Sequence, residues 1–558
     1  MKKYIVGIVV SLLATFTPHV VAATPPIDDG WQLLDLPIQG YFSVQFRDGR
    51  GNDPGGPYLS WGDGTNTGRG PRELLCDSTT SGECSPKTGS LNYFTRLPVC
   101  ASDSAMDCIE SIQSHLGSIN TPMTFVQNFP LKNKTTYTGD ASLNLPGGSS
   151  GSIWDIPGAP NSKGTKYFVD VRTRGTKSAA DTKFNTTSLD MSVYAVDLVK
   201  TINDSADAGA VQNSNGPGKE YLGFVGIYPN YANQQVDCVM SGDNLCADRR
   251  GMPDGLSFEM TLRLSSSPSG WLHGRLSNAD IKINPIGSSS AVRLTISGGA
   301  QRVPAVGVGM YWKDLPESLQ NAYSSNSFND KLMCRWCSAN PLLGTTVSQP
   351  KSSGLDALNE LRAWLPIINN TANADINTWS INTLDSTEMT GAPICFADHS
   401  KLLGLVTTNA TTYSAGPPDF DGSSLNYQVS APHFMSNGEL LKGDYKLILR
   451  SDVARCIYKF TSAPIKASIS VVTADGSTDV ATTVANETGG WLQLSASNFT
   501  FSSPTIQVKL SQDVPAPVVP ASQTSVAAKK ITITCVKGKT TKSVTAVKPT
   551  CPNGYRKK

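Results

Sequence analysis

The stretch from Asp452 to Leu510 constrains the fold most strongly, because apolar and polar residues alternate in several of its short segments. The alternation is clear in Ala467–Val471, Trp491–Leu494 and Ile506–Leu510. A period of two residues places every second side chain on the same face of a β-strand. The stretch therefore predicts a run of short strands, each with one buried face.

Glycine-containing turns separate these strand candidates. Asp475-Gly476 and Gly489-Gly490 are pairs that a tight hairpin favours, because glycine adopts a positive φ without steric cost. With no helical pattern recognised between the strands, we expect antiparallel pairing and a β-sandwich.

The rest of the chain suggests a mainly β, modular protein of two to four domains. Strand candidates include Tyr41–Phe46, Lys166–Val171 and Leu256–Leu264. The predicted divisions are a signal peptide (1–22), a large β-sandwich or barrel-like domain (23–312), a helical connector (313–369), a C-terminal β-sandwich (370–512), a Pro-rich linker (513–528) and a small basic tail (529–558).

Three segments carry helical spacing. Leu315–Trp336 and Ser353–Leu365 form the predicted connector, and in the second of these Ser353 and Asp356 are the expected N-terminal cap. Ser104–Leu116 is the only helical pattern in the early part of the chain.

The first residues predict export. Lys2 and Lys3 precede an apolar run and a small-residue Val-x-Ala pattern that ends near Ala22, as in a secretory signal peptide. We therefore expect a secreted protein that is extracellular or associated with the cell wall.

All twelve cysteines follow the predicted signal, and an even number in an exported chain favours disulfides. Short spacing suggests four local pairs. The remaining four cysteines allow three pairings, of which we favour Cys395–Cys456 with Cys334–Cys337. The local pairs are Cys76–Cys84, Cys100–Cys108, Cys238–Cys246 and Cys535–Cys551.

Charge is unevenly distributed along the chain. Of 47 basic residues, two lie in the signal segment and nine in residues 529–558, so 36 basic residues face 45 acidic ones in residues 23–528. The tail contains no acidic residue, and such a segment is attracted to polyanions. Its nine basic residues are Lys529, Lys530, Lys537, Lys539, Lys542, Lys548, Arg556, Lys557 and Lys558.

Motifs with catalytic or metal-binding potential are weak. Gly147–Gly151 matches the G-x-S-x-G pattern around Ser149 but lies in a Gly- and Pro-rich loop, and Cys334-Arg-Trp-Cys337 lacks a thioredoxin-like context. Asp- and Asn-rich loops at 48–56 and 63–68 could hold structural calcium, although Asx turns are the favoured interpretation. No other cofactor is expected.

Four segments resemble large secreted or cell-surface proteins of actinobacterial type that have a basic, cysteine-containing C-terminal tail. These segments are Ser269–Ile283, Asp452–Tyr458, Gly490–Ala496 with Phe501–Thr505, and the ending Ile533–Lys539 with Cys551–Lys558. The resemblance implies export and a modular β architecture, and it transfers no functional residue.

The leading hypothesis is a non-enzymatic surface protein with a structural or adhesive role. Its basic tail would bind an anionic cell-envelope polymer or a membrane surface. The alternative is a secreted carbohydrate-active enzyme or glycan-binding protein. That alternative would use Trp271, Trp312, Trp364 and Trp491 as stacking platforms and carboxylates among Asp254, Glu259, Asp419 and Asp421.

Overall fold

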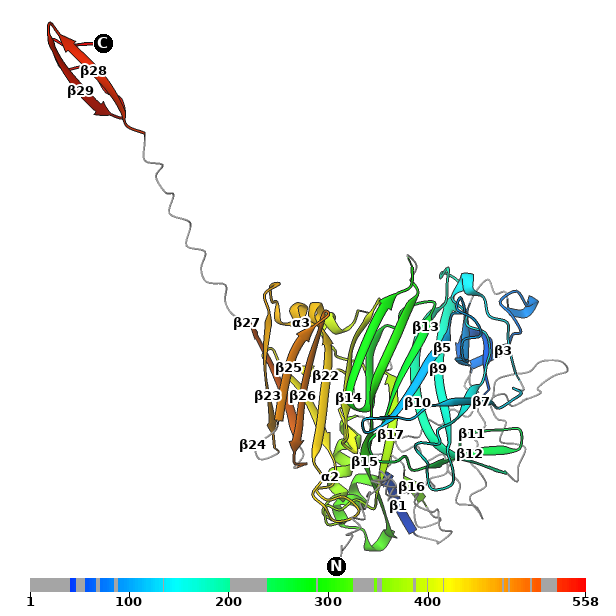
Figure 1. Cartoon of the computed structure of the whole chain (residues 1–558). Coiled ribbons are helices and arrows are strands. Elements are labelled where there is room, and N and C mark those ends of the chain that lie inside the picture. The colour runs from blue at the N-terminus through cyan, green and yellow to red at the C-terminus, as the bar shows by residue number, and fades with distance from the viewer. Residues whose placement is uncertain are drawn as a thin grey trace, which may run out of the picture. The chain divides into compact units, whose positions relative to one another are not determined.

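A computed structural model gives the fold (Figure 1). It describes residues 41–46, 56–66, 71–84, 89–133, 135–200, 238–287, 290–324, 346–348, 354–384, 388–398, 400–414, 416–473, 476–479, 482–501, 504–512 and 529–558. The predicted signal peptide, the Pro-rich linker, Cys334, Cys337, His399 and almost all of the loop at 48–56 lie outside these residues.

The protein is mainly β, as predicted. Strands of the first half are β1 (Tyr41–Phe46), β2 (Tyr58–Asn66), β3 (Pro71–Leu75), β4 (Ser90–Arg96), β5 (Cys108–Leu116), β6 (Ile119–Asn120), β7 (Thr124–Phe129), β8 (Gly151–Asp155), β9 (Lys166–Ser178), β10 (Asn185–Lys200), β11 (Cys238–Gly242), β12 (Leu245–Arg250), β13 (Leu256–Leu264) and β14 (Gly270–Pro285).

Later strands are β15 (Val292–Tyr311), β16 (Thr346–Ser348), β17 (Ala374–Thr383), β18 (Leu402–Thr408), β19 (Thr412–Tyr413), β20 (Asp419–Phe420), β21 (Leu425–Ser430), β22 (Gly443–Arg450), β23 (Ile465–Val472), β24 (Thr478–Asp479), β25 (Thr482–Thr488), β26 (Trp491–Phe499), β27 (Thr505–Gln512), β28 (Ile531–Lys537), β29 (Thr540–Ala546) and β30 (Arg556–Lys557). The α-helices are α1 (Glu317–Ser324), α2 (Leu355–Trp364) and α3 (Ser451–Tyr458).

Contacts divide the chain into a β body that ends at Ser511 and a second unit from Gln512 to Lys558. The main sheet of the body follows a continuous path of paired strands. In order, these are β3, β2, β4, β9, β10, β17, β14, β18, β22, β26 and β25. Figure 1 shows β22, β26 and β25 side by side in this sheet.

A second layer, formed by β5, β13, β15 and the second half of β14, covers one face of the main sheet. Apolar side chains from both layers form the largest core, in which Phe258 of β13 packs edge-to-face against Trp379 of β17. Because each strand contributes alternate residues to this core, the two layers form a β-sandwich.

A third layer packs on the other face of the main sheet, over its C-terminal strands. It contains β19, β21, β27, β23 and β24. Tyr427 and Val508 of this layer pack with Leu447 and Leu494 of the main sheet in a second core. The hairpin turn at Gly489-Gly490 forms as predicted, with both glycines at positive φ.

The predicted division into two β domains joined by a helical connector differs from the structure. Strands β17 and β18 belong to the predicted C-terminal domain, yet they pair with β10, β14 and β15 inside the main sheet. Helices α1 and α2 lie within the predicted connector region. They bury Leu319, Leu361 and Trp364 against Val44 and Val306 instead of spanning a gap between domains. The N-cap of α2 is Gly354, which forms no side-chain cap hydrogen bond.

Two local predictions are wrong. The segment expected to be helical, Ser104–Leu116, contains β5, where a register shift leaves Glu110 unpaired with β13. The bulge places Ile109 and Ile112 in the same core, which imitates helical spacing in the sequence. Helix α3 begins the stretch that we expected to be all strands, and its Val453, Ala454 and Ile457 are buried.

Four disulfides form among the described residues: Cys76–Cys84, Cys100–Cys108, Cys395–Cys456 and Cys535–Cys551. The pairing favoured for Cys395 is therefore the one in the structure. Cys246 is also disulfide-bonded. These bonds indicate an oxidising environment. Among the described helices, none is long and apolar enough to span a membrane.

Gly404 on β18 allows β14 and β22 to approach from both sides. A Cβ atom there would lie 2.7 Å from the carbonyl oxygen of Ile448 and would collide with the Trp271 ring. We expect Gly404→Ala to reduce the free energy of unfolding by about 1–3 kcal/mol, because both neighbours belong to packed strands. Chemical denaturation measures this, with Gly82→Ala as the control, since nothing lies within 4 Å of a Cβ atom at Gly82. Equal stability of the two variants would contradict the prediction.

The sequence Trp271–Arg275 predicts a hairpin around His273, but the structure places His273 inside β14. Its ring stacks on Tyr413 with centroids 3.7 Å apart, and its Nε2 has no hydrogen-bond partner among the described residues. Burial, together with the nearby Arg275 guanidinium, holds the pKa of His273 well below its ordinary value. Below about pH 6.5 the His273 imidazole therefore binds a proton in the unfolded chain but stays neutral in the folded chain.

Stability should consequently fall with acidification below about pH 6.5, and His273→Phe should remove part of this fall while keeping a ring against Tyr413. The difference between wild type and variant should change by about 2 kcal/mol between pH 7.5 and pH 5. The buried carboxyl of Asp444, whose pKa is raised to about 6 by burial, works in the opposite direction and is common to both proteins. Chemical denaturation at each pH measures the free energy of unfolding of both proteins. As a control, Tyr413→Phe should show the same dependence of stability on pH as wild type. Parallel pH profiles for wild type and His273→Phe would refute the role given to His273.

Candidate functional site

The nine predicted tail cations come together on one small folded unit. Strands β28 and β29 form an antiparallel hairpin in which Lys537 is opposite Thr540 (Figure 1). The two-residue turn begins with Gly538 at φ 59°, a value that glycine adopts readily at the first position of a hairpin turn. Strand β30 adds to the other edge of β28. The sequence also predicts this hairpin, from alternation in Ile531–Thr534 and Lys542–Val547, and the structure forms it with a third strand that the sequence did not reveal.

A disulfide fixes the returning C-terminal segment on the hairpin. Cys535, the only fully buried residue of 529–558, bonds to Cys551. The Nζ of Lys542 lies 5.5 Å from the centroid of the Tyr555 ring, and the Lys558 backbone N–H donates to the Thr534 carbonyl at 2.9 Å. With so few buried side chains, the module depends on its covalent closure more than on a core.

Every one of the nine cations is exposed. No carboxylate side chain occurs in residues 529–558, so these cations have no acidic neighbour within the module. Nine like charges on about thirty residues repel one another in the free protein. A bound polyanion would relieve this repulsion, which makes the module a candidate polyanion-binding site.

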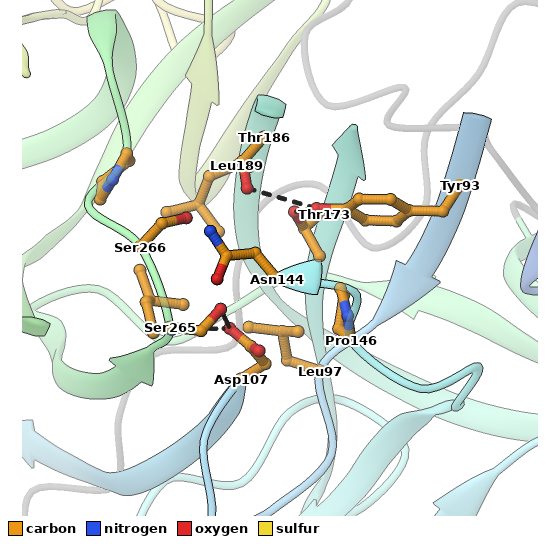
Figure 2. Close-up of a pocket in the computed structure, with 12 residues that line it drawn as sticks. Tyr93, Leu97, Asp107, Asn144, Pro146, Thr173, Thr186, Leu189, Ser265 and Ser266 are labelled. Atoms are coloured by element: carbon orange, nitrogen blue, oxygen red, sulfur yellow. Dashed lines mark hydrogen bonds between the residues drawn. The ribbon is translucent and has the colours of Figure 1, made fainter. Parts of the chain in front are cut away.

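The described pocket of the body is a different kind of feature. Figure 2 shows Tyr93, Asp107, Asn144, Thr173 and Ser265 around it. The backbone N–H and hydroxyl of Ser265 donate to Asp107 at 2.9 and 3.0 Å, and the Tyr93 hydroxyl shares one hydrogen bond of 3.3 Å with Thr173. Burial raises the pKa values of both Asp107 and Tyr93. The hydrogen bonds of Asp107 and Tyr93 join separate segments of the body to one another. The pocket has room for water but not for a sugar or a cofactor.

Other candidate residues serve the fold. The backbone N–H of Ser149 donates to Thr95 Oγ1 at 2.9 Å, and strand β8, not a helix, follows Ser149, so no nucleophile elbow forms. Trp271 and Trp364 are fully buried and are therefore not stacking platforms. Trp491 packs against the first core, with the Arg450 guanidinium 5.8 Å from its centroid.

The candidate carboxylates also have local roles. Asp254 accepts from the Asn377 side chain at 2.8 Å, and Asp421 accepts the backbone N–H groups of Ser423 and Ser424 at 2.8 Å. These hydrogen bonds, with one from Asn426, hold the pKa of Asp421 below its usual range. The loop expected at 63–68 instead continues β2 as far as Asn66. Among the described residues, no three His, Cys, Asp or Glu side chains are grouped so that they could hold a metal ion.

The body also contains a buried ionic network that sequence reasoning missed. Arg96 Nε donates to Asp170 at 2.9 Å, and Arg172 lies within 4 Å of both Asp170 and Asp190. Burial raises the pKa of Asp190 despite these arginines. The charged residues come from β4, β9 and β10, which meet only in the folded sheet. We therefore give the network a structural role, which is to hold these strands together.

Comparisons with known proteins give no relative: no family model matches the chain, and neither the curated proteins nor the solved structures contain a match.

Removing the tail disulfide tests whether the module depends on covalent closure. We expect Cys535→Ser/Cys551→Ser to destabilise residues 529–558 by about 3 kcal/mol, because the bond closes a loop of about fifteen residues. Trypsin should then cut faster at Lys537 and Lys542, which lie in paired strands of the wild-type module, while the unfolding transition of the body is unchanged. Equal resistance of both hairpins to trypsin would show that the disulfide is dispensable.

Proposed function

We propose that this protein is an exported surface protein whose acidic β body is held at an anionic envelope surface by its basic tail module. The observation that carries the proposal is the separate, disulfide-closed fold of residues 529–558, with nine exposed cations and no acid. The role expected for the body is structural or adhesive, and the protein is non-enzymatic.

The charge of the two parts supports this orientation. An anionic surface attracts a segment of formal charge +9 and repels residues 23–528, in which acidic residues outnumber basic ones by nine. The same protein would therefore approach such a surface tail first. Screening by salt limits the attraction to about 8–10 Å at physiological ionic strength, so binding of the tail to the surface is reversible and sensitive to salt.

The covalent and hydrogen-bonded construction of the body supports an extracellular role. Its strands form two hydrogen-bonded sheets, and disulfides cross-link the chain at several points. Such cross-links persist outside the reducing cytoplasm and restrict local opening of the chain.

Charge removal on the module tests the proposal. Lys539, Lys548 and Lys557 are exposed, and their side chains can be changed without loss of the Lys542–Tyr555 contact or the disulfide. We expect the K539Q/K548Q/K557Q variant to be released from isolated cell envelopes at a markedly lower salt concentration than wild type, because three of nine cations are lost.

The matched control is K539R/K548R/K557R, which keeps the charge and should elute with wild type. A second arm compares cells that express the chain with and without residues 513–558, measuring the fraction released into the medium. Release that is the same for all of these proteins, and that salt does not alter, would refute the tail as an anchor.

A further inference from the structure

The register of the tail hairpin separates its two faces by chemistry. Side chains of directly paired residues point to the same side of a sheet, and successive residues alternate. One face therefore carries five hydroxyl side chains in three rows, and we call it the hydroxyl face. Its members are Thr532, Thr534, Thr541, Ser543 and Thr545, with Val536 as the only apolar residue of the two strands on this side.

The opposite face is partly covered by the chain itself. Cys535 lies on that side and is bonded to Cys551, and Lys542 on the same side contacts the Tyr555 ring. The five hydroxyl residues, in contrast, are all exposed. The returning segment within residues 529–558 thus occupies one face of the hairpin and leaves the hydroxyl face open.

The hydroxyl groups form a regular, rigid array. Neighbouring strands are about 4.8 Å apart, and alternate residues along a strand are about 6.8 Å apart. Threonine has few χ1 rotamers, so little side-chain entropy is lost when a ligand binds. The Thr532 and Thr545 hydroxyls already share a hydrogen bond of 2.7 Å, and each retains further capacity to donate or accept.

Cations adjoin this array. Arg556 on β30 is paired with Val536 and therefore lies on the hydroxyl face, and Lys539 lies in the turn at one end of the hairpin. A polymer bound along the array would meet neutral donors and acceptors in the centre and positive charge beside them. That combination complements a chain of sugars that carries acidic groups, in which hydroxyls and carboxylates alternate.

A lipid surface complements the array less well. Apolar side chains that enter the headgroup region strengthen binding at a membrane interface, in addition to the attraction between cations and anionic lipids. The hydroxyl face offers only Val536, which is half-buried, and the exposed Ile531 and Val547 lie at the base of the hairpin, away from the turn.

We infer that the hydroxyl face binds an acidic polysaccharide, with its threonines bonding the sugars and the surrounding cations pairing with the acid groups. The inference rests on the proposed function and specifies its partner. Charge then supplies most of the attraction at low salt, and the hydroxyl array supplies a part of the affinity that persists when salt screens the charges.

The test uses the full chain and three probes: polygalacturonate, which has sugars and charge; polyphosphate, which has charge without sugars; and vesicles containing phosphatidylglycerol. At raised salt, wild type should bind polygalacturonate at least tenfold more tightly than polyphosphate. The T534V/T541V variant, which keeps charge and β-branched shape, should lose most of that preference and bind polyphosphate as wild type does.

Thr540 provides a matched control, because it neighbours Thr541 but faces the other side of the hairpin. T540V should keep the preference that T541V reduces. Wild-type polygalacturonate binding by T534V/T541V, or tighter binding to the vesicles than to polygalacturonate, would overturn the inference. If the inference fails in this way, loss of all binding in K539Q/K548Q/K557Q would still support the proposed function of the tail. Unchanged binding of that variant to every probe would refute the proposed function itself.

Discussion

The body depends on strands that are buried on both faces. On β18, Leu405 points into the first core and Val406 into the second, and on β22, Ile448 and Leu447 divide in the same way. A strand that contributes to two cores cannot be pulled out of one without disrupting the other. The two sandwiches predicted as separate domains are therefore joined through the middle layer. Within this layer, Gly404 of β18 leaves the space that the Trp271 ring of the neighbouring strand β14 occupies.

Local features of the sequence predicted local structure well. The strands β1 and β13, the Gly489-Gly490 turn and the tail hairpin involve residues that are close in the chain, so their alternation and turn residues are sufficient. The tail is the clearest case. Its two hairpin strands, its disulfide and its charges lie within thirty residues and could be identified before any tertiary contact was known, whereas the third strand, β30, could not.

The errors arose where distant segments determine the structure. The bulge at Glu110 depends on pairing with β13, about 150 residues later, and it makes a strand look helical in sequence. The boundary near residue 370 looked like a linker because nothing in β17 reveals that its partners are β10, β14 and β15. Arg96 and Asp170 appear in the sequence as ordinary surface charges, and only the meeting of β4 with β9 explains their burial.

The hydroxyl face was also missed, although all of its residues lie in the predicted hairpin. Charge composition drew attention to the lysines, whereas the exact register was needed to place five hydroxyls on one side and the disulfide on the other. The two kinds of group contribute differently. Charges attract any polyanion over several ångströms, and salt weakens them, whereas hydroxyls act only in contact and require a partner with matching donors and acceptors. A module with charge alone would bind an anionic surface without distinguishing its chemistry; the array of rigid hydroxyls beside the charges gives this small hairpin the means to discriminate.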